Sequence, residues 1–332
     1  AGTALEPGRR SCRQALASGL LAASGRPELA GMEGVTILAG HQPQDPAGGR
    51  VLAYGNCAYP YRRMGHYEPG CPPLAGQVLQ GLAALRPPAL PLVAPWPEGR
   101  APAAEVLRSL AAAGYAGIEL TLPTLEALAS GPGGLAEVAS LVGGHALRVF
   151  AVTAPLDLTG ASPEGVAGAR RCLSLASTLG APLMVVTVGG GEAEQAPIES
   201  WRAAVRALRE VGAAAQEVGI ELALPTVPGN LHARPEGALR LLRQAGLPDL
   251  GLALDVPGLL ALEEQPEAAL RRLLPWVRLV RLGPVSAPPA ASFCAALCES
   301  ACAGPLIVGS ECPEACRQEI AALRRALGER LL

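Results

Sequence analysis

The stretch GIELALPTVPGNLHARPEGALRLLRQAGLPDLGLALDVPGLL, residues 219–260, holds two short apolar runs joined by one amphipathic segment. The runs Ile220–Leu224 and Leu250–Leu254 are bounded by Gly and Pro, which is typical of buried parallel strands. Parallel neighbours need a crossover, usually a helix, and Pro235–Ala245 has the pattern of one. The stretch therefore predicts a strand–helix–strand unit, and folds built from such units place their chemistry at the corner after each strand.

The same alternation extends over residues 89–332. Apolar runs predict eight strands, at Leu90–Ala94, Gly117–Leu122, Leu147–Thr153, Leu183–Val188, Ile220–Leu224, Leu250–Leu254, Val277–Leu282 and Leu306–Val308. Helical patterns follow them, at Pro102–Ala113, Thr124–Leu141, Pro163–Leu179, Glu199–Val218, Pro235–Ala245, Pro266–Leu274, Ala290–Ala303 and Pro313–Leu331. Eight such units over about 245 residues predict an α/β fold of the (β/α)8 TIM-barrel type. The absence of a GxGxxG motif after the first strand disfavours the main rival, an open sheet that binds a dinucleotide.

Residues 1–86 have a different pattern. Helices are predicted at Ser11–Ser24 and Leu74–Leu85, and strands at Val35–Ala39 and Val51–Tyr54. A loop, GNCAYPYRRMGHYEPGCPP, is predicted over Gly55–Pro73. We therefore expect two domains, a small α+β domain with cysteines at 1–86 and the barrel at 87–332.

Composition excludes several classes of function. The 27 basic and 29 acidic side chains are interspersed and give a net charge of -2, which disfavours nucleic acid and anionic membrane as partners. The chain has no lysine, which excludes a Schiff-base lysine and a Walker lysine. No apolar run reaches the ~18 residues of a membrane-spanning helix. Nine cysteines in a core-rich chain favour reduced thiols and a cytoplasmic location, and homo-oligomerisation is left open.

Several segments resemble one family in their order and spacing. They are GYAGIEL (Gly114–Leu120), LASTLGAPLMVVTVGGG (Leu175–Gly191), the stretch quoted above, and ECPEACRQEIAALRRAL (Glu311–Leu327). Over about residues 89–332 they resemble the xylose-isomerase-like barrel family of sugar-phosphate isomerases and epimerases. The resemblance implies a small sugar or sugar phosphate as ligand. It also implies a divalent metal that polarises the sugar while carboxylates move a proton.

The implied metal ligands are matched only in part. The resemblance expects a carboxylate after strand five, an Asp after strand six, a His after strand seven and a Glu after strand eight. The chain has Pro225-Thr226, Asp255, Arg281 and Glu311 there. Two of four ligands do not make a site for a hard cation, so we expect no divalent metal in the barrel. We expect Arg281 to replace it between Asp255 and Glu311 and to hold a ligand; the alternative is a structural salt bridge.

Other polar residues at strand ends are further candidates. Glu119 matches the acid of the GIEL segment, so it is a catalytic candidate together with Asp255 and Glu311. Thr187, Thr226 and His232 are candidates for binding substrate beside Arg281, although a loop His is more often a solvated surface residue. The side chains of Glu119, Thr121, Thr153 and Thr187 face the barrel mouth only if the predicted strand register is correct.

Six of the nine cysteines form two groups. Cys12, Cys57 and Cys71, with His66, could bind zinc or an iron–sulfur cluster, or the segment could be a structural turn with buried thiols. The GNC and GCPP segments also resemble a small uncharacterised module associated with iron–sulfur clusters. The spacing of Cys294, Cys298 and Cys302 instead predicts one packed helix face.

Three functions are compatible with these patterns. The first is a sugar isomerase or epimerase with a degenerate metal site, metal-independent or impaired. The second is a barrel that binds a sugar or polyol without catalysis. The third is an iron–sulfur or zinc protein whose activity lies in the N-terminal domain. Fold alone does not choose among them.

Overall fold

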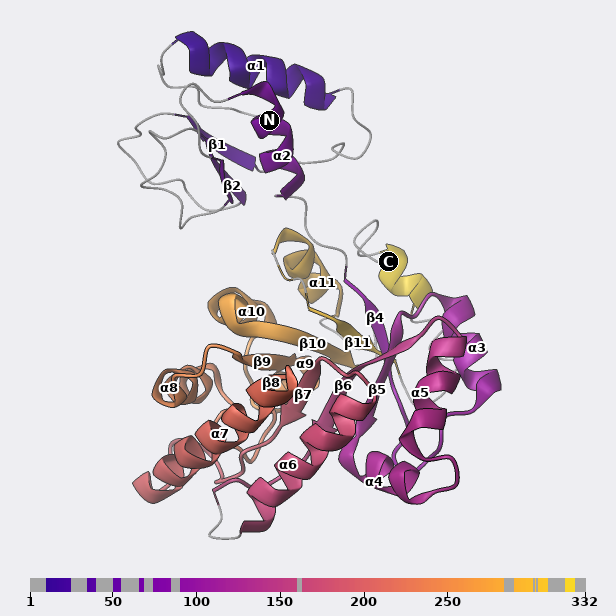
Figure 1. Cartoon of the computed structure of the whole chain (residues 1–332). Helices are drawn as coiled ribbons and strands as arrows, with labels where there is room; N and C mark the ends of the chain where they lie inside the picture. Colours follow the sequence, from indigo (N-terminus) through magenta and orange to yellow (C-terminus); the bar gives the residue numbers. More distant parts are fainter. Residues whose placement is uncertain are drawn as a thin grey trace. The chain divides into compact units, whose positions relative to one another are not determined.

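A computed structural model describes residues 10–24, 35–39, 50–54, 66–68, 74–84, 90–159, 163–283, 290–300, 302, 304–309 and 320–325. The chain divides into two compact units, Ala1–Pro88 and Ala89–Leu332 (Figure 1). The predicted division into separate domains at 1–86 and 87–332 stays a prediction.

The first unit combines two helices with a small sheet. Its elements are α1 (Arg10–Ser24), β1 (Val35–Ala39), β2 (Arg50–Tyr54), β3 (His66–Glu68) and α2 (Ala75–Ala84). The three strands pair in parallel in the order β1-β2-β3. Leu16, Ile37, Leu52, Val78 and Leu82 form its apolar core.

One prediction for this unit is wrong. His66–Glu68 was expected in a loop, but it forms β3 because it pairs with Leu52–Tyr54 of β2, a contact that no local pattern shows. The predicted zinc or cluster ligands stay a prediction. Cys57 and Cys71 lie outside the described residues, and Cys12 is on α1 with its side chain not described.

The second unit is a closed barrel of parallel strands. They are β4 (Leu92–Pro95), β5 (Gly117–Thr121), β6 (Arg148–Ala154), β7 (Leu183–Val186), β8 (Glu221–Pro225), β9 (Leu250–Asp255), β10 (Val277–Gly283) and β11 (Leu306–Val308). Each strand pairs with its neighbour in the chain, and β11 closes the ring on β4. The predicted (β/α)8 barrel is confirmed.

Helices alternate with these strands. They are α3 (Ala104–Ala113), α4 (Leu122–Ser130), α5 (Gly134–Gly144), α6 (Pro163–Thr178), α7 (Ile198–Val218), α8 (Pro235–Ala245), α9 (Val256–Ala261), α10 (Pro266–Leu273) and α11 (Ala290–Glu299). Residues 274–276 form a 3-10 turn, and residues 320–325 are helical. None of the described helices is long and apolar enough to cross a membrane.

Two helix predictions need correction. The single helix expected at Thr124–Leu141 is two helices, because Gly131-Pro132-Gly133 interrupts it and Gly133 takes a left-handed φ of 81°. The cysteine face is also shorter than expected. Helix α11 ends at Glu299, so Cys302 lies beyond it, although Cys294 and Cys302 are both buried in the core.

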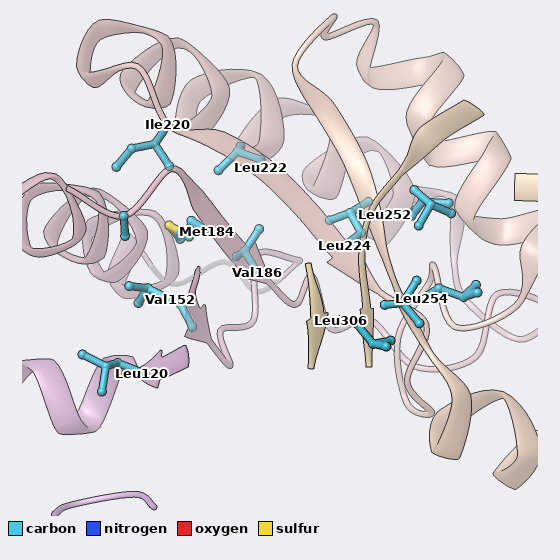
Figure 2. Packing of buried hydrophobic residues seen from close by; sticks show 14 of the residues in the cluster. Leu120, Val152, Met184, Val186, Ile220, Leu222, Leu224, Leu252, Leu254 and Leu306 are labelled. Atoms are coloured by element: carbon cyan, nitrogen blue, oxygen red, sulfur yellow. The ribbon is translucent and has the colours of Figure 1, made fainter. Parts of the chain in front are cut away.

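The strands bury both faces. One large cluster packs the outer face against the helices, and Figure 2 shows members from β5 to β9 and from β11: Leu120, Val152, Met184, Leu222, Leu252 and Leu306. A second cluster takes side chains from around the ring and fills the interior: Val93, Phe150, Ala151, Leu183, Val185, Ala223, Ala253, Leu279 and Ile307. Because side chains alternate along a strand, the next interior positions toward the carboxyl ends hold Thr153, Thr187, Pro225, Asp255 and Arg281.

Candidate functional site

Arg281 lies at the centre of the polar layer that closes the barrel interior. Its Nη2 donates to Oε1 of Glu119 at 2.6 Å, and its Nη1 donates to Oδ2 of Asp255 at 3.4 Å. Asp255 is on the neighbouring strand β9, in register with Arg281. Glu119 is on β5, which β11 and β4 separate from β10. The guanidinium therefore reaches across the mouth, and we call Glu119, Asp255 and Arg281 the carboxylate–guanidinium cluster.

The cluster is buried but keeps one open side. The side chains of Glu119 and Asp255 are 6% and 9% exposed, whereas that of Arg281 is 27% exposed. Burial alone would lower the pKa of Arg281, but the two carboxylates raise it above its ordinary value. Arg281 is therefore charged, and it is the most exposed side chain of the three.

Besides Asp255, Arg281 contacts a carboxylate that was not expected there. The pairing with Asp255 has the expected partners, but the other carboxylate in contact is Glu119. Glu311, the residue expected there, lies outside the described residues. Its role stays a prediction.

Asp255 uses both carboxylate oxygens. Oδ1 accepts the backbone N–H of Gly258 at 2.7 Å and so caps α9, while Oδ2 accepts from Arg281. Burial raises the pKa of Asp255, although Arg281 and the Gly258 N–H both act to lower it. Asp255 therefore holds a proton more readily than an ordinary aspartate.

Glu119 has one engaged oxygen. Its Oε1 accepts from Arg281 and also from Oγ1 of Thr153 on β6, at 2.5 Å. Among the described residues, Oε2 has no hydrogen-bond partner. Two donors thus fix the carboxylate while leaving one oxygen available to a ligand or a proton.

Thr187 and Thr226 are occupied by backbone contacts. Oγ1 of Thr187 donates to the carbonyl of Leu156 at 2.6 Å. Thr226 is fully buried, and its Oγ1 accepts the N–H of Asp255 at 2.8 Å. Both hydroxyls therefore hold the ends of strands in place, so their predicted contact with substrate stays a prediction.

His232 is fully buried, so the expectation that a loop His is solvated is wrong for it. Its Nδ1 lies 2.8 Å from the carbonyl of Pro225, and its Nε2 accepts the N–H of Val188 at 3.2 Å. The two partners require the neutral tautomer with the proton on Nδ1. Burial lowers the pKa of His232 to about 4. The ring thus fastens the loop after β8 to the end of β7.

Asn230 has a role that the sequence did not suggest. Its Oδ1 accepts the N–H of Gly189 at 2.8 Å, and its Nδ2 donates to the carbonyl of Pro228 at 3.1 Å. Gly189, Gly190 and Gly191 have φ of 76°, 85° and 75°, a conformation that favours glycine. The Pro-Gly-Asn turn was the only sequence signal for this contact between two loops.

A family model, the xylose isomerase-like TIM barrel, matches residues 107–296, more than half of the chain. The chain belongs to this family. No curated protein sequence matches the chain.

Solved structures of the family's fold are similar but distant in sequence. A 3-keto-D-glucoside 4-epimerase from E. coli has a TM-score of 0.60 at 16% identity and covers 71% of this chain and 99% of its own. A D-allulose 3-epimerase from Methylomonas sp. has a TM-score of 0.60 at 19% identity, and the match covers 72% of this chain and 98% of the epimerase. A probable 3-DHS dehydratase from Bacillus anthracis has a TM-score of 0.55 at 15% identity, and the match covers 66% of this chain and 92% of the dehydratase. At these identities the likeness shows the fold alone.

The metal that the family resemblance implies does not fit the described side chains. Pro225 ends β8 where a carboxylate was expected, and the guanidinium of Arg281 lies against Asp255. Within the described part of the chain, no group of three or more His, Cys, Asp or Glu is arranged to hold a metal ion. A hard divalent cation needs several oxygen or imidazole donors and is repelled by a guanidinium at the same place.

Proposed function

We propose that the barrel transfers a proton at the carbon next to a carbonyl of a small sugar, and that it does so with Arg281 in place of a divalent metal. The observation that carries this proposal is the contact of the Arg281 guanidinium with Glu119 and Asp255 at the barrel mouth. Its family's similar structures include sugar epimerases, which supports a sugar as the ligand.

Each member of the cluster has a chemical role in this proposal. Oε2 of Glu119 accepts the proton as the C–H bond breaks, and the electron pair moves to the carbonyl oxygen. Arg281 stabilises the resulting enediolate oxygen by a charge-assisted hydrogen bond. Asp255, whose pKa is raised, returns a proton to carbon on the other side, which gives the epimer or isomer. Solvent at the open mouth then restores the starting protonation states.

The proposal is tested by hydrogen exchange without metal. The protein is dialysed against EDTA and incubated in D2O with a panel of D-ketoses: fructose, allulose, tagatose and xylulose. NMR then follows deuterium at the carbon next to the carbonyl and the appearance of the epimer. We expect exchange with at least one ketose, at a rate that EDTA does not change.

A matched pair of variants assigns the exchange to the cluster. Arg281→Met should abolish it. Arg278→Met should not, because Arg278 lies on the same strand but pairs with Glu221 at the other end of the barrel. Exchange that appears only after Mn²⁺ is added would contradict the proposal, and so would equal loss in both variants.

A second candidate function is sugar or polyol binding without catalysis. It is favoured by Asp255, because one of its oxygens caps a helix and the other accepts from Arg281, contacts that a purely structural carboxylate would also make. Saturable binding of a ketose by calorimetry, with no deuterium exchange, would support this candidate over the first.

A further inference from the structure

A groove of about 340 Å³ follows the seam between α7 and α8, two helices that pack against each other on the outside of the barrel (Figure 1). Both helices contribute to its lining, which consists of Ile198, Trp201, Arg202, Val205, Arg206 and Gln244. The isoleucine, the two arginines and the glutamine are exposed, so the groove is open to solvent along its length. We call it the α7–α8 groove.

The floor of the groove is apolar. Trp201 is buried, Val205 is half-buried, and Ile198 is one of the few large apolar side chains that the barrel exposes. Arg240 of α8 stacks over the ring of Trp201, with its guanidinium carbon 3.9 Å from the ring centroid. Among the described residues, Arg240 has no carboxylate within ion-pair distance. A positive charge therefore lies directly beside the apolar floor.

Arginines also follow the other side of the seam. On α7, Arg202, Arg206 and Arg209 are spaced by four and three residues, so they share one face of the helix. Arg209 donates to the last carbonyls of α8, those of Gln244 at 2.9 Å and Ala245 at 3.1 Å. Neither Arg202 nor Arg206 forms an ion pair with a carboxylate in the part of the chain that the structure describes. Like charges at this spacing repel each other, so the bare groove carries uncompensated positive charge.

The carboxylates of the same two helices do not compensate this charge. Glu210 of α7 pairs with Arg170 of α6 at 3.0 Å, and Glu236 of α8 pairs with an arginine of α10. Glu199 and Glu217, near the two ends of α7, do not line the groove. Pairs of opposite charge thus bridge the neighbouring seams, whereas arginines lie on both sides of the α7–α8 seam.

We propose that the α7–α8 groove is a docking surface for an acidic amphipathic helix of a partner protein. The apolar face of that helix packs on Ile198 and Val205, and its carboxylates pair with Arg202 and Arg206, because a guanidinium binds a carboxylate through two parallel hydrogen bonds. The two arginines are one helical turn or about 6 Å apart, which is also the spacing of two acidic residues four positions apart on the docked helix.

The open shape and the apolar floor favour this partner over other anions. Sites for small molecules bury roughly 70–90% of the ligand, which an open groove does not do. Nucleic acid binds chiefly through its phosphates and gains little from an apolar floor. The groove lies on the outside of the barrel, so this inference does not depend on the proposed function.

The test uses a synthetic peptide of Ala, Leu and Glu, about 16 residues long so that it can form a helix. Leucines follow one face, and glutamates flank them at spacings of four residues. A second peptide has Gln in place of every Glu. Calorimetry on the 332-residue chain at low salt should show binding of the Glu peptide, and binding of the Gln peptide at least tenfold more weakly. Added salt should weaken the binding of the Glu peptide.

Two double variants assign this binding to the arginines of the groove. Arg202→Gln with Arg206→Gln should weaken the Glu peptide at least tenfold. Arg170→Gln with Arg171→Gln changes the net charge equally but lies on α6, where both arginines already pair with glutamates. This control should bind the Glu peptide as the wild type does.

A second matched pair tests the apolar floor. Ile198→Ser should weaken the Glu peptide, whereas Val218→Ser, at an exposed position of the same helix outside the groove, should not. Failure of the Glu peptide to bind at millimolar concentration would overturn the proposal, and so would equal weakening by the two arginine double variants. Single-stranded DNA bound as tightly as the Glu peptide, with no effect of Ile198→Ser, would assign the groove to polyanions in general and overturn it as well.

Discussion

Arg281 of β10 contacts Glu119 of β5 at 2.6 Å across the barrel mouth, although 162 positions separate the two residues in the chain. The contact closes the interior with a cation held between two carboxylates. It makes the stability of the barrel depend on the same three side chains to which we assign chemistry.

Removal of the cation should therefore destabilise the fold. Arg281→Met leaves Glu119 and Asp255 buried without their partner. We expect a loss of about 2 kcal/mol in the free energy of unfolding, less than the ~3–5 kcal/mol for a fully buried pair because Arg281 is partly exposed. Denaturant unfolding measures the loss. Arg278→Met should cost less than about 1 kcal/mol, because its partner Glu221 is half exposed. Equal losses of unfolding free energy in Arg281→Met and Arg278→Met would contradict the expected contribution of the cluster to stability.

Asp255→Asn should separate stability from function. Burial raises the pKa of Asp255 in the folded state, so the folded protein binds its proton more tightly than the unfolded chain does. The ionised carboxylate therefore reduces stability as the pH rises through the folded pKa. Asn keeps the oxygen that caps α9 and carries no charge.

We expect Asp255→Asn to be as stable as the wild type at pH 7, or more stable, while formation of the epimer is lost and deuterium exchange through Glu119 remains. Asp255→Ala, which also removes the cap, should be less stable than Asp255→Asn by about 1 kcal/mol. A large loss of stability in Asp255→Asn would contradict this account of the carboxylate.

His232 should make the fold sensitive to acid. Its pKa falls from 6.5 to about 4 on folding, so the unfolded chain binds a proton in this window and the folded protein does not. Stability therefore decreases as the pH falls from about 6.5 to 4, by about 3 kcal/mol from this residue. His232→Asn can still donate to Pro225 but does not titrate. As the pH is lowered, the free energy of unfolding should decrease less steeply for this variant than for the wild type. Parallel curves for the two proteins would refute the assignment of this acid sensitivity to His232.

Alanine substitutions in the glycine run after β7, Gly189–Gly191, should distinguish the cost of backbone strain from that of a steric clash. Gly191→Ala has no atom within 4 Å of the new methyl, so it should cost only about 1 kcal/mol for the left-handed φ. In Gly189→Ala the methyl would lie 2.5 Å from Oδ1 of Asp157. That oxygen already accepts from the backbone and hydroxyl of Thr159, so it is held in place. We expect Gly189→Ala to lower the free energy of unfolding by at least ~1 kcal/mol more than Gly191→Ala does. Thermal or denaturant unfolding of the two variants measures this difference.

The sequence predicts the fold well because each strand and helix carries its own local signal. Short apolar runs bounded by Gly and Pro fall on the barrel strands, and the helical pattern at 235–245 matches α8. Helix α9 was not predicted, because it is only six residues long and depends on the cap from Asp255. The break between α4 and α5 was visible in Gly131-Pro132-Gly133 but outweighed by the apolar pattern around it.

The site was less predictable because its contacts cross the barrel. Which carboxylate meets Arg281 depends on the closure of β11 on β4 and on a register shift between β5 and β6 at Ile118 and Glu119. The burial of His232 depends likewise on Val188, 44 positions earlier. Local patterns find the residues at the ends of strands, but they do not show which of them meet.

The central claim is that Arg281 stands where a divalent cation would otherwise be bound. Calorimetric titration of the EDTA-dialysed 332-residue chain with Mn²⁺ tests it most directly, because thiolates of the N-terminal unit are poor ligands for this hard ion. The account predicts no binding tighter than millimolar in the wild type. One Mn²⁺ bound per chain at micromolar affinity, and lost in Asp255→Asn, would contradict it.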